Sequence, residues 1–348
     1  MAQKVISSAA DTEPEILFAS LGMFIIDEIE YLDGSSLKDI IGGAGTYAAF
    51  GARYFLPSPA SKGVGWIVDS GSDFPESIRK DLFALDTTMI FRKDDSRLTT
   101  RGWNGYTEND YRAFKYLTPK KRITTDDIVD TPLLKSRSFH LICSPERATA
   151  LINGLNDSRA ANNPNLPKPV IVWEPVPDLC TPEHLQACFA ALPSVDILSP
   201  NSAEAAAFFG LPEPTDKKAI EEIAIRFIPY MRDDAAVVLR AGALGSLIIA
   251  KNSKIIWLES YHAPWPELVV DPTGAGNTFV GAMCVGYILS GGDLVEAAIY
   301  GNIAAGLSIE QVGLAKPTFP TNERDNELWN GTRVMDRVDH YKKRIRLK

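Results

Sequence analysis

The distribution of apolar and polar residues along the chain predicts strands that alternate with helices. Short apolar runs of strand length occur at residues 15–20, 64–69, 138–143, 170–174, 195–198 and 235–240. Between most of these runs, apolar residues recur every three or four positions, as is typical of helices, notably in 182–192, 202–209 and 219–230. The alternation predicts an α/β fold, a three-layer sandwich in which a mostly parallel central sheet carries helices on both faces.

The patterns in residues 246–348 predict a hairpin followed by helices. Residues 246–250 and 254–258 are separated by Lys-Asn-Ser and predict an antiparallel hairpin. Residues 274–289 and 293–311 have the pattern of two long helices. Residues 331–348 are rich in Lys and Arg, and their apolar positions have helical spacing, so they predict a basic amphipathic helix docked on a body formed by 1–330. A tail for nuclear import or partner binding is the alternative.

Residues 88–126 differ from the rest of the body. The segments 88–93, 98–103 and 112–117 have the character of exposed strands rich in Thr, Arg and Tyr. Inserted early in an α/β chain, they predict a small β lid that closes over a ligand. An edge used for contacts between the subunits of a homodimer is the alternative.

Composition and charge narrow the classes of function. The 348 residues are 45% hydrophobic and 23% charged, with a formal net charge of −8. This negative charge argues against binding to nucleic acid or to an anionic membrane, and no apolar run approaches the roughly 20 residues that span a bilayer. The first 15 residues do not resemble a signal peptide. The four cysteines are scattered, which predicts reduced thiols in a cytoplasmic protein rather than disulfides or a zinc site.

The segment that indicates a function is 271–282, with the sequence Asp-Pro-Thr-Gly-Ala-Gly-Asn-Thr-Phe-Val-Gly-Ala. An extended stretch ends at Asp271, and Gly274, Ala275 and Gly276 open a long predicted helix. Small residues let backbone N–H groups approach a ligand, and a helix N-terminus favours negative charge. The segment therefore predicts an anion-binding cradle, although a plain glycine turn has the same composition.

This segment resembles a signature of the ribokinase-like (PfkB) family of carbohydrate kinases, which runs Asp, any residue, Thr, two small residues, Gly, Asp. The resemblance implies that Gly274, Ala275 and Gly276 form an anion hole and that Thr273 contacts the nucleotide. It also implies that the last position removes the proton of the attacking hydroxyl. Asn277 stands at this position, and an amide has no basic lone pair at neutral pH.

Other motifs follow in the order of the same family. Asn201 and Glu204 are similar to an Asn-x-x-Glu motif, which implies a role in placing Mg²⁺, through water at Asn201, and the ATP phosphates; the same residues could also cap a helix. Arg240, Gly242 and Gly245 lie in a strand followed by Gly-x-x-Gly, which implies contacts with the nucleotide. The family usually has Thr at position 240 and Lys at position 244. By the same resemblance, Asn302 lies beside the adenine.

The resemblance also places a substrate end. Asp27 follows Gly22 by five residues and is implied to accept hydrogen bonds from sugar hydroxyls. Gly42 and Gly43 form a turn before a helix, and Tyr47 stands where sugar kinases usually have Asn, which predicts a pocket unlike that for ribose. Residues 99–104 and the Asn form of the signature resemble a fungal subgroup known for maintenance of the killer virus. In all, the similarity spans about residues 17–313.

Two functions remain open. The first is an ATP- and Mg²⁺-dependent kinase of a hydroxylated carbohydrate or nucleoside. The second is a pseudokinase, inactive or catalytically weak, that binds nucleotide or sugar and acts through closure or partner contacts. A dinucleotide-binding fingerprint also fits formally from Gly43 to Ala48, but it requires a strand of a βαβ unit directly before it.

Overall fold

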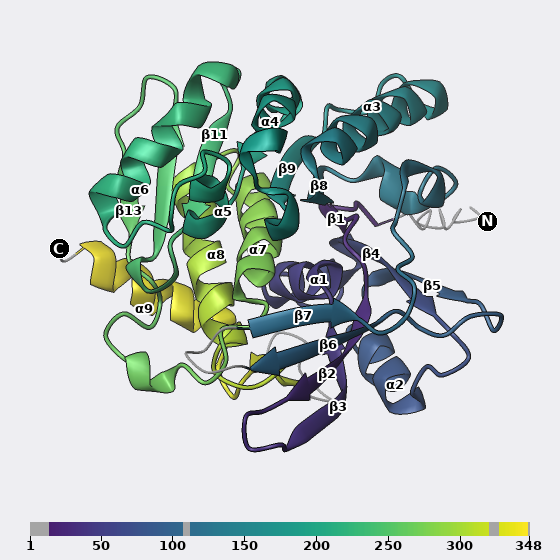
Figure 1. Ribbon diagram of the computed structural model, residues 1–348. Coiled ribbons are helices and arrows are strands. Elements are labelled where there is room, and N and C mark those ends of the chain that lie inside the picture. Colours follow the sequence, from purple (N-terminus) through teal and green to yellow (C-terminus); the bar gives the residue numbers. More distant parts are fainter. Residues whose placement is uncertain (1–13, 107–111, 320–326, 347–348) are drawn as a thin grey trace, which may run out of the picture.

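A nine-stranded sheet forms the centre of the computed structural model, which describes residues 14–106, 112–319 and 327–346 (Figure 1). The strand order is β13-β12-β11-β10-β9-β8-β1-β4-β5. Along this order, each strand from β11 to β5 pairs in parallel with the next. The pairs β11–β12 and β12–β13 are antiparallel, which confirms the predicted late hairpin. The bounds are β1 Phe18–Ser20, β4 Val64–Ser70, β5 Thr88–Lys93, β8 Ser138–Cys143, β9 Val170–Pro175, β10 Ile197–Leu198, β11 Ala236–Arg240, β12 Ser246–Ala250 and β13 Ile256–Leu258.

Helices cover both faces of this sheet, because its strands present apolar side chains in both directions. Val238 packs into one core with α1 (Ala44–Tyr54), α7 (Ala275–Leu289), α8 (Leu294–Ser308) and α9 (Val334–Arg346). Its neighbour Val237 packs into the other core with α3 (Pro145–Asn162), α4 (Leu185–Ala191), α5 (Ser202–Ala207) and α6 (Lys217–Ala224). Alternation along a strand thus yields the expected three layers. The remaining helix, α2 (Glu76–Ala84), packs through Ile78 and Leu82 into the first of these cores.

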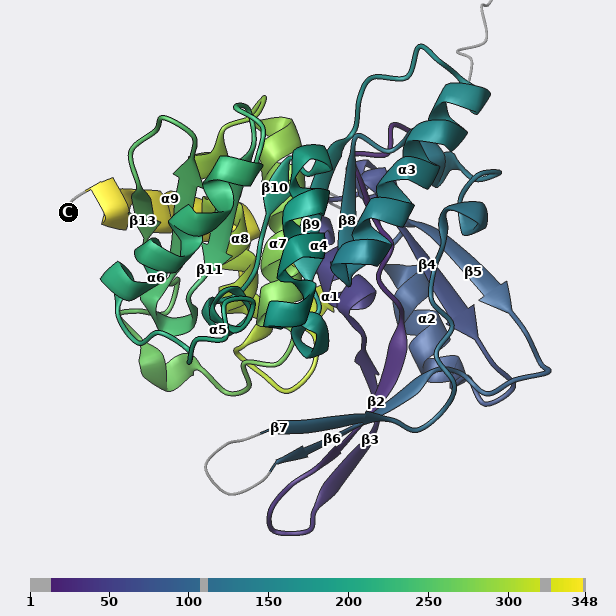
Figure 2. The same cartoon turned by 45° about the horizontal axis from the view of Figure 1, so that its top comes forward.

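A separate four-stranded sheet projects from the body (Figure 2). Its order is β3 (Ser36–Gly42), β2 (Ile25–Glu30), β6 (Arg101–Tyr106) and β7 (Arg112–Tyr116). We call this sheet the lid. It contains two of the segments predicted for it, but half of it comes from 25–42, which the sequence analysis did not assign to a lid.

One segment that was predicted to belong to the lid, 88–93, lies in the central sheet instead. It was expected in the lid, but it forms β5 and pairs in parallel with β4 at the edge of the central sheet. The dinucleotide fingerprint also finds no support. Although β3 leads directly into Gly43, β3 pairs antiparallel with β2 in the lid and is not part of a βαβ unit.

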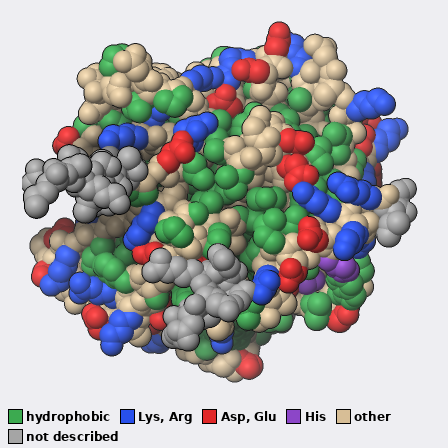
Figure 3. Space-filling view, turned by 180° about the vertical axis from the view of Figure 1, so that it is seen from behind, with side chains coloured by type: hydrophobic (Ala, Val, Ile, Leu, Met, Phe, Trp, Pro, Cys, Tyr) green, Lys and Arg blue, Asp and Glu red, His purple; other side chains and the backbone are tan. Residues whose placement is uncertain are grey.

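The C-terminal segment folds back onto the body as α9, with Val338 and Tyr341 buried. A small ribbon of β14 (Pro317–Thr318) and β15 (Leu328–Trp329) precedes it. Residues 1–13 and 347–348, which carried part of the expectations for the two ends, lie outside the described residues. Viewed from behind, the surface mixes hydrophobic side chains with charged side chains of both signs (Figure 3). Within the described part of the chain, no helix is long and apolar enough to cross a bilayer.

Candidate active site between the lid and the central sheet

A pocket of about 200 Å³ lies where the lid meets the start of α7. It joins residues that are far apart in sequence, because α1, α7 and three lid strands or their ends converge here. Ligands of open α/β folds bind outside the carboxyl ends of the strands, which is also where this pocket lies. The lining residues are Ile25, Asp27, Gly43, Ala44, Tyr47, Phe114, Tyr116, Thr273, Gly274 and Asn277.

At the lid end, two glycines make room for the carboxylate of Asp27. Asp27 lies on β2, the second strand of the lid, opposite Gly102 of β6. A β-carbon added at Gly42 would lie 1.9 Å from one carboxylate oxygen, and one at Gly102 would lie 2.9 Å from the other. The side chain is 6% exposed and borders the pocket. The glycines of two neighbouring strands therefore fix where this carboxylate lies.

At the cradle end, an aromatic ring packs directly on the glycine that opens α7. Gly274 is the N-cap of the helix, with φ +78°, a conformation that favours glycine. A β-carbon there would also lie 2.2 Å from the ring of Tyr47. The first turn of α7 directs backbone donors and the positive end of the helix dipole to this end of the pocket.

Behind the pocket, the buried carboxylate of Glu174 accepts two hydrogen bonds and forms an ion pair. The Nδ2 of Asn277 lies 2.8 Å from Oε2, and His140 Nε2 lies 2.9 Å from the same oxygen. A guanidinium nitrogen of Arg240 lies 2.8 Å from Oε1. Glu174 stands near the carboxyl end of β9 and is 3% exposed. The family signature places a base at position 277. In this structure the position holds an amide that is hydrogen-bonded to the carboxylate of Glu174.

Arg240 links this carboxylate to the predicted Asn-x-x-Glu motif. Its second guanidinium nitrogen lies 3.2 Å from Glu204 Oε2 and 3.0 Å from the carbonyl oxygen of Ser199. Asn201 and Glu204 form a capping box at the start of α5, because each side chain bonds the backbone N–H of the other residue. The predicted capping is therefore confirmed, and both oxygens of Glu204 already accept hydrogen bonds.

The two glutamates differ in acidity. Burial would raise the pKa of Glu174, but the charge of Arg240 and the bonds from His140 and Asn277 hold this pKa below its usual range. Burial raises the pKa of Glu204 to about 7; Arg240 opposes this rise and the charge of Glu174 adds to it. At neutral pH the site therefore contains one firmly ionised carboxylate next to Arg240 and a second that is near its titration midpoint.

Besides Asn201, Glu204 and Arg240, which are also absent from the pocket lining, three further predicted nucleotide residues lie away from it. Gly242 and Gly245 form the turn after β11, with φ +54° and +96°, and a β-carbon on Gly245 would collide with the carbonyl oxygen of Leu258 at 2.0 Å. Asn302 is buried in α8, where its Nδ2 donates to Ser246 Oγ at 3.0 Å and to Tyr341 Oη at 3.1 Å. The contacts of these three residues with a nucleotide stay predictions.

The sequence analysis missed four residues of the site. Glu174 and His140 were not singled out, although a polar residue near the carboxyl end of a buried parallel strand is a recognisable signal. Phe114 and Tyr116 alternate on β7 and both line the pocket, with ring centroids 4.9 Å apart. Two aromatic residues at positions i and i+2 of a lid strand could have indicated a common face.

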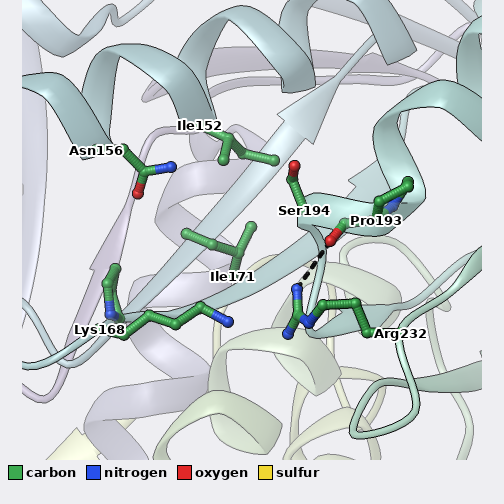
Figure 4. A pocket seen from close by; sticks show the side chains of 8 residues that line it. Ile152, Asn156, Lys168, Ile171, Pro193, Ser194 and Arg232 are labelled. Carbon is green, nitrogen blue, oxygen red and sulfur yellow. Dashed lines mark hydrogen bonds between the residues drawn. The ribbon is translucent and has the colours of Figure 1, made fainter.

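A second hollow, of about 190 Å³, lies at the opposite ends of the strands (Figure 4). Its polar lining includes Lys168 and Arg232, which precede β9 and β11. Both side chains form ion pairs with Asp196. We place the functional site at the other pocket, because only that pocket brings the cradle and Asp27 together.

Comparisons with known proteins identify the family of this chain. Residues 133–322 match the model of the pfkB family of carbohydrate kinases. The chain is 39% identical over 346 residues to the protein MAK32 of Saccharomyces cerevisiae, an alignment that covers 95% of this chain and 93% of that protein. The chain belongs to the PfkB family. The similarity to MAK32 also confirms the narrower fungal resemblance.

Solved structures of PfkB proteins named as ribokinases share the fold. A ribokinase from Giardia lamblia superposes with a TM-score of 0.70 at 17% identity, covering 95% of this chain and all of that one. A ribokinase from Arabidopsis thaliana, solved with ribose and ATP, superposes with a TM-score of 0.63 at 18% identity, covering 86% and 94% of the two chains. At this level of identity the likeness shows the ribokinase-like fold with its separate lid.

Proposed function

We propose that this PfkB protein transfers the γ-phosphate of ATP to a hydroxyl of a small carbohydrate or nucleoside. One observation carries the proposal: Asn277 and the cradle at Thr273 and Gly274 open into the same pocket as Asp27 and the rings of the lid. A phosphoryl donor at the first end and a hydroxyl acceptor at the second would therefore meet within one cavity. The ribokinase solved with ribose and ATP supports this pair of ligands.

Each end of the pocket suits its ligand chemically. The carboxylate of Asp27 accepts hydrogen bonds from hydroxyls, and Tyr47, Phe114 and Tyr116 offer apolar faces to a ring. At the other end, the start of α7 and Arg240, whose guanidinium lies against Gly276, suit an anion. The lid would exclude water from the acceptor, which limits hydrolysis of ATP.

The residues of the site offer more contacts to a nucleotide than to Mg²⁺. Among the described residues, no group of three or more His, Cys, Asp or Glu side chains could hold a metal ion. Mg²⁺ would therefore take most of its oxygens from the phosphates and water, with Glu204 as the protein carboxylate and Asn201 acting through water. When bound, Mg²⁺ supplies charge that neutralises the phosphates.

Asn277 limits the expected rate. Its amide can accept a hydrogen bond from the acceptor hydroxyl and orient it, but it cannot take the proton. Loss of a general base costs a factor of about 10²–10⁴ in rate. Phosphoryl transfer depends mainly on positioning and charge neutralisation, so a slow kinase is compatible with this site.

A pseudokinase is the second candidate, and the contacts of Arg240 favour it. The guanidinium already lies against the cradle and is neutralised by Glu174 and Glu204, so a phosphate would compete with these two carboxylates. A protein of this kind would bind a nucleotide or sugar and act through closure of the lid.

Two measurements on the purified full chain separate these functions. ADP release is measured with Mg-ATP and a panel of sugars and nucleosides, and ATP binding is measured by calorimetry. Turnover with any acceptor, lost in Arg240→Ala and kept in the exposed Arg226→Ala, supports the kinase. Binding without turnover supports the pseudokinase, and no binding contradicts both.

A further inference from the structure

The hydrogen bonds behind the pocket form a chain that ends on one carboxylate. The backbone N–H of Gly22 donates to Ser20 Oγ at 3.1 Å, and this oxygen lies 3.1 Å from His140 Nδ1. The opposite ring nitrogen of His140 lies 2.9 Å from Glu174. A carboxylate only accepts hydrogen bonds, so His140 donates from Nε2, and in the neutral ring Nδ1 accepts a hydrogen bond from the Ser20 hydroxyl. Every donor along this chain is thus directed toward Glu174.

The same reasoning fixes the orientation of Asn277. The contact between its side chain and Glu174 Oε2 is 2.8 Å long, and only the NH₂ end of an amide can donate to a carboxylate. The carbonyl oxygen of Asn277 is therefore the end that remains for a ligand. Because Asn277 also lines the pocket, an acceptor hydroxyl there would find a hydrogen-bond acceptor with a fixed direction.

The contact with Glu174 also restricts which residue can stand at 277. An Asp at this position would place a second carboxylate at hydrogen-bonding distance from Glu174. Two ionised carboxylates cannot coexist at this distance, so one of them would hold a proton. Asn277 is thus a neutral hydrogen-bond partner for Glu174. An amide at position 277 is therefore explained by the carboxylate at position 174.

We propose that Glu174 is a positioning residue of the reaction end of the pocket: it holds the amide of Asn277 so that the carbonyl oxygen of Asn277 faces the acceptor hydroxyl. This inference rests on the proposed kinase function. In the hydrogen-bonded pair formed by these two side chains, residue 174 supplies the carboxylate and residue 277 supplies the amide. Reversing the pair, with the amide at 174 and the carboxylate at 277, places a base beside the acceptor without creating two adjacent charges.

A cycle of four proteins tests the proposal: the wild type, Asn277→Asp, Glu174→Gln and the double variant. Glu174→Gln should lower kcat, because the amide of Asn277 loses its fixed direction. Its KM for ATP should not rise, because Arg240 loses a carboxylate that competes with the phosphates. Asn277→Asp alone should not raise turnover. The double variant should exceed the wild type by about 10²-fold, the range of a restored general base. A single Asn277→Asp variant as active as the double variant would overturn the proposal.

A second readout does not depend on activity. In Asn277→Asp the shared proton is lost as pH rises, so the thermal midpoint, relative to the wild type, should fall as the pH rises above the usual pKa of a carboxyl group. The double variant should lack this fall, and so should the control Asn163→Asp, whose site is exposed. Charged or titratable groups facing Glu174 are His140, Arg240, Glu204 and Cys284, and all four are present in every variant.

The two readouts separate failure of this inference from failure of the proposed function. If none of the four proteins transfers phosphate, the proposed kinase function is wrong. The pH dependence of the thermal midpoint then remains as the test of the contact between Glu174 and Asn277. A pH-independent effect of Asn277→Asp would then refute the role of Glu174. If the double variant does not fold, the pH dependence of the thermal midpoint of Asn277→Asp still tests the role of Glu174.

Discussion

The guanidinium of Arg240 occupies the space in which Gly276 lacks a side chain. A β-carbon added at Gly276 would lie 1.9 Å from a guanidinium nitrogen of Arg240 and 3.7 Å from Glu174 Oε1. The glycine of the cradle and the arginine that ends β11 therefore depend on one another. A cation is thereby held against the start of α7, the end of the pocket proposed to bind the phosphates.

We predict that Gly276→Ala destabilises the protein, although alanine is the better helix former. The new methyl group would displace Arg240 and break its ion pairs with Glu174 and Glu204, leaving buried charges without a partner. We expect a loss of about 3 kcal/mol in the free energy of unfolding. Urea unfolding followed by circular dichroism measures this loss.

Arg240→Ala provides the control for this prediction. In the background of Arg240→Ala, the change Gly276→Ala no longer meets the guanidinium, so its additional cost should nearly vanish. Equal costs in both backgrounds would show that the methyl group collides with something else.

We predict that Asp27→Asn weakens the acceptor and not the nucleotide. The amide keeps one acceptor oxygen but loses the charge and bidentate geometry of the carboxylate, so the KM for the acceptor should rise about tenfold or more. The KM for ATP should stay within about twofold. Steady-state kinetics checks both values, and the exposed Asp81→Asn serves as the control.

Much of this site could be predicted from sequence because its parts are local. The cradle is one continuous segment whose glycines open a helix, and the capping box of Asn201 and Glu204 spans one turn. Most of the parallel strands were also recognisable, because they are largely buried and mostly apolar. The exception is β5, whose residues are half-buried or exposed, and this segment was assigned to the lid.

The remainder depends on pairings between distant segments. Glu174 contacts His140 and Asn277, which are 34 and 103 residues away, and no local pattern encodes such distances. The lid was half missed because most residues of β3 are exposed or half-exposed, so the strand shows no alternation of apolar and polar positions. Likewise, the need for glycine at 102 follows from the pairing of the lid strands, which brings this position against Asp27 and the ring of Phe114.

We predict that Tyr341→Phe destabilises the attachment of α9. The hydroxyl of Tyr341 donates to the carbonyl oxygen of Glu259 at 2.5 Å and accepts from Asn302 Nδ2 at 3.1 Å, and the residue is fully buried. Removing the oxygen leaves both partners with an unmet hydrogen bond, at a cost of about 1–3 kcal/mol. The exposed Tyr230→Phe should cost less than about 0.5 kcal/mol. Equal midpoints of denaturation for the two variants would contradict this prediction.

We predict that Glu310 makes stability depend on pH in the acid range. Burial would raise its pKa, but hydrogen bonds from His262, Arg337 and Asn330 lower the pKa of Glu310 to about 2. Because the folded-state pKa lies below the unfolded value, this stabilisation is present above about pH 4.5 and is lost as the pH falls toward 2. Its upper limit is about 3 kcal/mol, from a shift of about 2.5 pKa units.

The variant Glu310→Gln measures this contribution directly. At pH 7 its free energy of unfolding should lie about 2–3 kcal/mol below that of the wild type, and the gap should narrow steadily between pH 4.5 and the lowest pH at which both proteins fold. Glu296, which pairs with Lys342 on the surface, provides the control, and Glu296→Gln should cost under about 1 kcal/mol. A gap for Glu310→Gln that stays constant with pH would mean that packing, rather than the charge of Glu310, stabilises the junction between α8 and α9.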